Sequence, residues 1–539
     1  MEQGHYELAK KYILYRQKHK ERRDAKNQLM ETYEDIFFSK SDDADFKREN
    51  ANINTDAPMG IMLKLGTEGA KQFVCDYILK PEYVKMHKEG FAHLHDLDFS
   101  IITLNCCVID ILKLMEGGFC TGHGFLREPK SIRSAAAIAC IALQSNQNDE
   151  FGGQALGSFD FAMAKYVRLS FVKSLKINLK KMLKYLGKEN NKIDDYTFET
   201  SYKDYHVNDA AKLGIEEPLF KKAYEITCAD VEDETFQAME AVIHNFCSLH
   251  SRSGSQVPFS SLNYGIDISP EGQLVQDKLL DATWNGLGNG ETPIFPIQVF
   301  SLKTGVNYRP EDPGYWLFQK ACKVSAKRLF PNFLNQDSPY NAQYYKEGNR
   351  NSYVATMGCR TRVMGNVNGP EESGSRGNFS FVTLNLPMMA LGAKRDLDKF
   401  WKIYDHYIEL AHDYLLERLE IIGNKHAYNF PFLMGQGVWM DSDKLKPEDK
   451  VREVLKHASI SIGFIGLMEC LVALIGKHHG ESEEAQELGL KIVQHLRDKT
   501  DEYKKKEKLN WSTFSSPAEG FSGAGLRALR KRFGVIKGV

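Results

Sequence analysis

Short apolar segments that are typical of buried strands alternate along this chain with long segments of helical periodicity. Four strands are expected, at residues 258–266, 293–302, 378–386 and 459–466. The clearest helix is expected over residues 400–422. Its apolar residues recur on one face: Trp401, Tyr404, Ile408, Ala411, Leu415 and Leu419. Strands separated by long helices indicate an α/β architecture.

The N-terminal region has a different pattern. Residues from Tyr6 to about Tyr33 show helical spacing with dense charge, which predicts an exposed amphipathic helix. A polar stretch at 39–54 follows, and globular composition begins near Ala57. The charged start is not a secretory signal, and no apolar run approaches the ~18 residues of a membrane span. We therefore expect a cytoplasmic protein.

Composition narrows the class of protein further. The 539 residues are 42% hydrophobic and 26% charged, with a net charge of -1, as in soluble globular proteins. This balance gives no electrostatic reason to expect nucleic acid or a membrane as partner. The ten cysteines are scattered without any C-x-x-C, which argues against a disulfide framework and a zinc ribbon. Any one of them is most simply a small buried side chain.

One cysteine has unusual neighbours. In TMGCRTRV, Cys359 follows Gly358 and is flanked by Arg360 and Arg362. Positive charge favours a thiolate, and glycine allows a tight turn at a loop tip. A structural cysteine in a basic loop remains the alternative. Further on, Asn378 enters an expected strand, where an amide can orient a substrate hydroxyl or simply cap a turn.

The segment HLHDLDFSIITLNCCVID contains several chemically active side chains. His93, His95 and Asp96 precede a strand-like run that ends in Cys106 and Cys107. Adjacent residues of a strand point to opposite faces, so only one of the two cysteines can face a cavity. A metal site at the histidines is a weak hypothesis, because no nearby cysteine completes the ligand set.

SSPAEGFSG, at residues 515–523, precedes a helix-like run. Free backbone N–H groups at a helix N-terminus bind phosphate readily. The plain alternative is an N-cap at Ser515 or Ser516 with Pro517 in the first turn, and the two interpretations are compatible.

Taken in order, these segments resemble one family. HLHDLDF…NCCVID, LREPKSI, PFSSLNYG, GLGNGETPIFPIQVF, MGCRTRV, GNFSFVTLNLP, ASISIGFIGLMECL and SSPAEGFSG…FGVIKGV resemble the anaerobic (class III) ribonucleoside-triphosphate reductases, from about Ala51 to Val539. The resemblance implies a ten-stranded α/β barrel with a central finger loop, whose tip carries a thiyl-radical cysteine.

The resemblance also implies residue roles. Cys359 would take the 3′ hydrogen of the ribose, and Cys106, or alternatively Cys107, would supply the reducing hydrogen from the opposite face. Asn378 would hold the substrate hydroxyls, which implies formate as reductant and CO2 as product. The ribose and phosphates would be held by two sets of residues: Ser260 and Ser261, and the turn of Ser515, Ser516, Ala518, Glu519 and Gly520.

Partners and cofactors follow from the same resemblance. It implies a homodimer, dNTP and ATP effectors, and a radical-SAM activating protein. Residues 1–50 resemble the last helix of an ATP cone with its linker, and 51–539 the barrel. The family's four-cysteine zinc site and glycyl-radical loop do not occur in this sequence. We therefore expect the radical glycine to come from a segment supplied in cis or in trans.

Two other functions remain open. The first is a catalytically inactive or split-gene fragment that binds nucleotides and needs a glycyl-radical segment in trans. Another glycyl-radical enzyme, such as a formate-lyase relative, would commonly carry neighbouring cysteines at the finger tip. Cys359 stands alone between Gly358 and Arg360, which favours the reductase.

Overall fold

A single large sheet organises the protein. The computed structural model describes residues 6–38, 57–252, 256–358, 361–516 and 519–538. Five parallel strands form one half of the sheet: β2 (Cys106–Ile109), β5 (Gln154–Leu156), β6 (Ser260–Tyr264), β7 (Ile297–Leu302) and β8 (Asn332–Asn335). Three parallel strands form the other: β11 (Arg376–Asn385), β12 (Ser459–Ile465) and β13 (Asn510–Ser515).

The two halves meet where β2 pairs antiparallel with β11. We call this pairing the seam. With β1 (Ala92–Leu94), which pairs antiparallel with β11, the sheet joins nine strands within the described residues rather than the ten expected. In this hydrogen-bonded path, β8 and β13 are the two ends.

The strands form where the sequence predicted them. The expected strands at 258–266, 293–302, 378–386 and 459–466 correspond to β6, β7, β11 and β12, with bounds that differ by a few residues. All residues of β6 and all but one of β12 are buried, since helices cover the sheet. Unbroken apolar runs are typical of parallel strands that are covered in this way.

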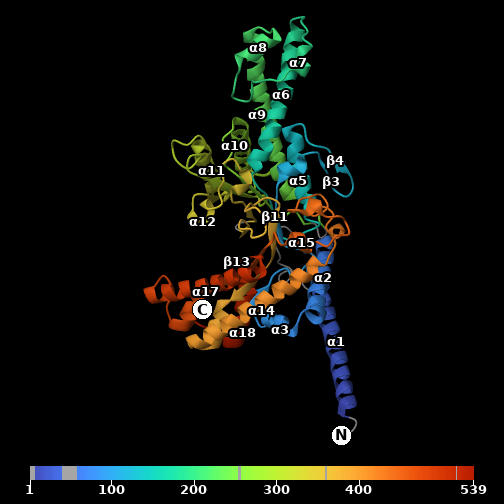
Figure 1. Ribbon diagram of the computed structural model, residues 1–539, viewed down its shortest axis with the longest axis vertical. Coiled ribbons are helices and arrows are strands. Elements are labelled where there is room, and N and C mark those ends of the chain that lie inside the picture. Colours follow the sequence, from blue (N-terminus) through green and yellow to red (C-terminus); the bar gives the residue numbers. More distant parts are fainter. Residues whose placement is uncertain (1–5, 39–56, 253–255, 359–360, 517–518, 539) are drawn as a thin grey trace.

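Long helices connect and cover the strands. The expected helix at 400–422 is α14 (Leu397–Gly423), and the N-terminal helix is α1 (Tyr6–Phe38), which projects away from the body (Figure 1). At the opposite end, α6 (Phe159–Tyr185) and α9 (Glu217–Ser248) pack against each other and extend from the sheet (Figure 1). The α/β class and the N-terminal helical extension are therefore confirmed.

The remaining helices of eight or more residues are α2 (Pro58–Phe73), α3 (Pro81–Lys88), α5 (Ile132–Asn146), α10 (Pro270–Asn285), α11 (Tyr315–Arg328), α13 (Leu386–Ala393), α16 (Leu467–Ile475), α17 (Glu483–Glu507) and α18 (Glu519–Phe533). Shorter helical turns are α4 (Ile111–Met115), α7 (Lys192–Asp195), α8 (Val207–Leu213), α12 (Pro339–Ala342) and α15 (Arg452–Leu455). No helix in the described part of the chain is long and apolar enough to cross a membrane.

A short hairpin packs against one face of the sheet. Its strands are β9 (Thr356–Met357) and β10 (Thr361–Arg362), and β9 contacts β2, β5 and β6. We call this hairpin the finger and the face that it touches the inner face. A small apolar cluster, separate from the main core, joins the two: Val108, Ala155, Ala355, Met357 and Val363. A loop therefore packs on the inner face of the sheet, where the family resemblance placed a finger loop.

One secondary-structure expectation is wrong. The run before Cys106 looked strand-like, but residues 95–102 form turns and the strand begins only at Cys106. Asp96 adopts a left-handed conformation with φ 50°, and its carbonyl accepts a hydrogen bond from the amide of Phe99. These local hydrogen bonds replace the sheet pairing that the apolar residues suggested.

Candidate functional site

Amide side chains hold residues 354–357, which lead into the finger and which we call its ascending arm. Asn263 of β6 pairs with Thr356 at both backbone groups: its Oδ1 accepts from Thr356 N at 2.8 Å, and its Nδ2 donates to Thr356 O at 2.9 Å. Gln336 makes the same pair of bonds with Val354, at 2.9 and 3.1 Å. Two side chains thus replace a neighbouring strand along this arm.

The tip of the finger lies against β5 and β6. Gly358 is buried, has φ 59°, and its amide donates to Ser261 Oγ at 3.2 Å. A Cβ at Gly153 would lie 3.2 Å from Gly358 N, so glycine lets the two segments approach. Cys359 itself, and Arg360, lie outside the described residues.

A buried arginine holds residues 361–373, which lead away from the finger and which we call its descending arm. Arg376, at the start of β11, is fully buried and donates to four backbone carbonyls. Its Nη1 reaches Met364 O and Glu372 O, its Nη2 reaches Gly365 O, and its Nε reaches His457 O, all at 2.8–3.0 Å. Burial lowers the pKa of Arg376 to about 10, so the guanidinium keeps its charge at neutral pH. This residue fixes the finger to the strand that carries Asn378.

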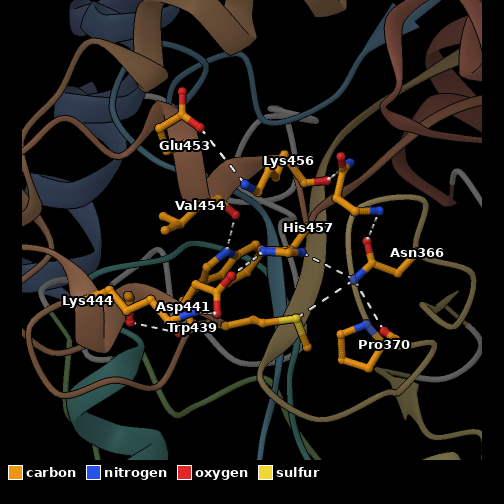
Figure 2. A network of polar contacts seen from close by, with 12 residues as sticks. Asn366, Pro370, Trp439, Asp441, Lys444, Glu453, Val454, Lys456 and His457 are labelled. Carbon is orange, nitrogen blue, oxygen red and sulfur yellow. Dashed lines mark hydrogen bonds and ion pairs between the residues drawn. The ribbon is translucent and has the colours of Figure 1, made fainter.

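A polar network continues from this arginine. Figure 2 shows His457 between Asp441 and Asn366, with His457 Nε2 2.9 Å from Asp441 Oδ2 and Nδ1 3.2 Å from Asn366 Nδ2. Burial lowers the pKa of His457, although Asp441 opposes this shift. Asn510 of β13 donates to Asn366 Oδ1 and accepts from the amide of Val367. The descending arm is thereby tied to β12 and β13.

Two predicted catalytic residues face each other across the seam. Cys106 and Asn378 are direct partners in the β2–β11 register, so their side chains share one face. Cys106 Sγ accepts from Gly153 N at 3.3 Å and packs against the inner apolar cluster. Cys107 points to the opposite face and is fully buried in the main core. The strand pleat therefore places Cys106, and not Cys107, beside the finger.

The Cys106 thiol is protonated at neutral pH. Burial raises its pKa well above 9.0, and the nearby Glu150 carboxyl adds to this shift. A protonated thiol retains the hydrogen that a hydrogen-atom donor must transfer.

Asn378 has one free end. Its side chain is 2% exposed, and its Nδ2 donates to Ser459 Oγ at 3.0 Å and Ser461 Oγ at 3.2 Å. Its Oδ1 is buried and has no hydrogen-bond partner among the described residues. Buried polar atoms in native proteins nearly always have a partner, so an oxygen of this kind indicates a place for a ligand donor.

The side chains of the two serines of β6 point to opposite faces of the sheet. Ser261 faces the finger, whereas Ser260 lies on the other side of the strand, beside Gln154 of β5. The hydroxyl of Ser260 is buried and lacks a hydrogen-bond partner within the described part of the chain. Of the pair predicted to hold the ribose, the structure brings only Ser261 to the inner face.

The predicted phosphate turn lies at the end of β13. Ser515 is the exposed last residue of that strand, and Ser516 is buried. Ala518 lies outside the described residues. Glu519 and Gly520 begin α18, whose backbone alone is described there. The helix expected after the turn is thus present.

A chain of hydrogen bonds reaches Ser516. Thr383 Oγ1 donates to Ser516 Oγ at 2.7 Å, and His95 Nε2 lies 2.7 Å from Thr383 Oγ1. Since the threonine hydrogen points to Ser516, the bond from His95 must be donated by Nε2–H. The Ser516 hydroxyl hydrogen is then free to reach a ligand. A Cβ at Gly463 would overlap Ser516 Oγ, so this position also needs glycine.

The neighbouring histidines are neutral. Burial lowers the pKa of His93 to about 3 and that of His95 well below 6.5, and the positive charges of neighbouring groups add to both shifts. No group of three His, Cys, Asp or Glu side chains suited to a metal ion occurs in the residues that the structure describes. The weak metal hypothesis for this segment gains no support.

With this geometry in place, comparison with known proteins decides the family. Residues 49–539 match the family described as anaerobic ribonucleoside-triphosphate reductase. This protein belongs to that family. Its relatives in Haemophilus influenzae and Escherichia coli, both with that name, are each 29% identical and align with 99% of this chain and 69% of their own length. The bacteriophage T4 reductase is 28% identical over 92% of this chain and 74% of its own length.

Solved structures show the same fold. An anaerobic ribonucleotide reductase superposes with a TM-score of 0.63 over 95% of this chain and 72% of the other, at 14% identity. The reductase of Thermotoga maritima with dATP in its specificity site gives 0.61 over 96% of this chain and 80% of the other, at 15% identity. The barrel type expected from the sequence is therefore confirmed.

Sequence reasoning missed several side chains that hold the candidate site together. Asn263 and Gln336 hold the finger, Arg376 joins it to β11, and Thr383 links His95 to Ser516. Asn263 could have been predicted from the sequence, because it lies two residues after Ser261 in a strand and therefore on the same face. Arg376 and Thr383 carried none, since their partners are distant in sequence.

Proposed function

We propose that this chain reduces ribonucleoside triphosphates to deoxyribonucleoside triphosphates, with Cys359, Cys106 and Asn378 as the reacting and substrate-binding residues. The observation that carries the proposal is the pairing of Cys106 with Asn378 across the seam, beside the buried Gly358 that precedes Cys359. The Cys106 thiol and the Asn378 amide oxygen then lie on the inner face, against which Gly358 of the finger also packs.

The overall reaction has formate as reductant and balances as ribonucleotide plus formate plus one proton giving deoxyribonucleotide, CO2 and water. Cys359 removes the 3′ hydrogen atom, the 2′-hydroxyl is protonated and leaves as water, and the Cys106 thiol gives a hydrogen atom to C2′, which leaves a 3′-ketone and a Cys106 sulfur radical. Formate gives a hydrogen atom back to that sulfur and its remaining electron to the ketone, and is released as CO2. The Cys359 thiol then returns its hydrogen atom to C3′. The family's glycyl radical supplies the oxidising equivalent when its segment is present. Asn378 Oδ1, which has no hydrogen-bond partner within the described ranges, accepts a hydrogen bond from a ribose hydroxyl.

The residues present suit such chemistry. A radical must be kept from water, and β9 of the finger is buried and packed on an apolar cluster. Positioning accounts for much of the rate, because sulfur and hydrogen must be nearly in contact. The four hydrogen bonds of Arg376 and the amide pairs of Asn263 and Gln336 supply that rigidity.

The triphosphate is assigned to the other end of the inner face. The proposed site comprises Ser515, Ser516, Ala518, Glu519 and Gly520, of which Glu519 and Gly520 begin α18. Backbone N–H groups and the helix dipole at such a helix start attract anions. Ser516 contributes a hydroxyl whose hydrogen is free because Thr383 already donates to its oxygen. Ser261 contributes from β6, and Ser260, on the opposite face, has no direct contact in this assignment.

Partners and domains complete the proposal. By analogy with the Thermotoga maritima reductase solved with dATP and CTP, this protein binds a dNTP effector as well as substrate. It acts in the cytoplasm as a homodimer, is activated by a radical-SAM protein, and consists of an ATP-cone remnant at 1–50 and a barrel at 51–539.

The test is anaerobic turnover. The chain is mixed with a glycyl-radical segment, its activating protein, formate and CTP, and dCTP is measured. Turnover should depend on formate and should be lost in Cys359→Ser and Cys106→Ser, while Cys107→Ser should retain it. Full turnover by Cys359→Ser would overturn the assignment. Binding of CTP without product under these conditions would favour a non-catalytic nucleotide-binding protein.

A further inference from the structure

The Cys106 thiol makes a second contact that the proposed reaction does not use. Its Sγ–H donates to Asn105 Oδ1 at 2.7 Å, and Asn105 Nδ2 donates to Asp96 Oδ2 at 2.5 Å. We infer that Asn105, anchored by Asp96, is a positioning residue that fixes the direction of the Cys106 S–H bond. This inference rests on the proposed role of Cys106 as hydrogen donor.

The orientation of the Asn105 amide is set by its partner. Asp96 Oδ2 accepts the hydrogen bond from Asn105 Nδ2, so the NH2 end of the amide faces the Asp96 carboxyl group. The carbonyl end must then face the thiol. Because an amide has one end of each kind, Asp96 determines through Asn105 where the thiol hydrogen points. The backbone of Asn105 is itself fixed, since its N–H donates to Phe379 O of β11 at 3.2 Å.

The surrounding space is shaped for this contact. A Cβ at Gly152 would overlap Asn105 Oδ1 and lie 2.9 Å from Cys106 Sγ. The amide N–H of Gly153 donates to the same sulfur at 3.3 Å. The sulfur thus accepts from one side and donates to another, and Asn105 is 5% exposed, which keeps water from competing for the thiol hydrogen.

The arrangement has a chemical consequence. In the resting protein the S–H bond of Cys106 points to the amide oxygen of Asn105. The hydrogen can be transferred to the ribose only after rotation about the Cβ–Sγ bond. The amide therefore holds the hydrogen away from the substrate until the ribose radical forms. Loss of the amide leaves the hydrogen free to sample every direction of the thiol rotor.

Infrared spectroscopy of the full chain tests this directly. The S–H stretch absorbs in a window free of other protein bands, and subtracting the spectrum of Cys106→Ser isolates the Cys106 band. We expect a band lowered in frequency by hydrogen bonding in the wild type. Asn105→Leu should raise it to the frequency of a free thiol, and Asp96→Leu, which releases the amide, should broaden it or shift it the same way.

A matched control is available in α6. Asn178 is 7% exposed, and its Nδ2 donates to Asp230 Oδ2 at 2.8 Å, so Asn178→Leu removes an equally buried amide bound to a carboxylate. The Cys106 band should not move in that variant. An unchanged band in Asn105→Leu, or in Asp96→Leu if the first variant fails to fold, would overturn the inference.

The inference and the proposed function fail separately. Full turnover by Cys106→Ser in the reconstituted enzyme would overturn the catalytic role and leave the band shift intact. If both hold, Asn105→Leu should lower kcat with little change in KM, because the amide does not contact the substrate.

Discussion

Replacing Arg376 by methionine should release the descending arm of the finger. The variant keeps a stem of similar length but removes a fully buried guanidinium that donates to four backbone carbonyls. A hydrogen bond from a charged donor contributes about 1.5–3 kcal/mol, and water entering the vacated space recovers part of this. We expect a loss of about 4 kcal/mol in local stability, which corresponds to roughly a thousandfold faster local opening.

Hydrogen exchange measured by mass spectrometry is the assay. Residues 361–373 contain protected amides, including those of Val367, bonded to Asn510 Oδ1, and Ser373, bonded to Asn351 O. In Arg376→Met the exchange of these amide hydrogens should be roughly a thousandfold faster than in the wild type. The control is Arg350→Met, which removes a one-third exposed ion pair with Asp110 and should cost about 1 kcal/mol or less. Exchange in Arg376→Met within tenfold of wild type would refute the reasoning.

Three other predictions concern separate parts of the molecule. His95→Phe removes the donor to Thr383 and should weaken CTP binding about tenfold without affecting the binding of cytidine. His95→Gln keeps a donor and should bind CTP normally. Equal losses of affinity for CTP and cytidine in calorimetry would contradict this. Burial raises the pKa of Asp149 in the folded protein to about 6. As pH rises from about 4 to 6, Asp149 therefore loses its proton in the unfolded chain before it does so in the folded protein, and the free energy of unfolding falls. Asp149→Asn should remove that fall, worth about 3 kcal/mol, and urea midpoints with unaltered pH dependence would disprove it. Gly152→Ala should cost about 1–3 kcal/mol because its Cβ meets Asn105, while Gly124→Ala, with open space around it, should melt like wild type.

The sequence predicted the elements whose pattern is local. Strand β12 and helix α14 were recognisable because buried parallel strands and amphipathic helices each have a characteristic apolar pattern. The apolar residues before Cys106 gave a wrong prediction, because they suggested a strand where the structure has turns. The turn at Asp96 depends on a left-handed backbone conformation, which the pattern of apolar residues does not reveal.

The site was only partly predictable. The resemblance named Cys106, and the pleat of β2 then excluded Cys107, which no local pattern distinguishes. Asn378 was recognised at the mouth of its strand, but its partners Ser459 and Ser461 belong to another strand. Pairing of this kind is decided by which strands become neighbours, and one sequence does not record it.

The seam has a consequence for how damage to this enzyme would be detected. Only three residue pairs join β2 to β11, and Cys106 belongs to one half of the sheet while Asn378 belongs to the other. A substitution that breaks the pairing of β2 with β11 would leave each half of the sheet with its own parallel strands and its helices. Circular dichroism would then register an intact protein, although Cys106 and Asn378 are no longer neighbours.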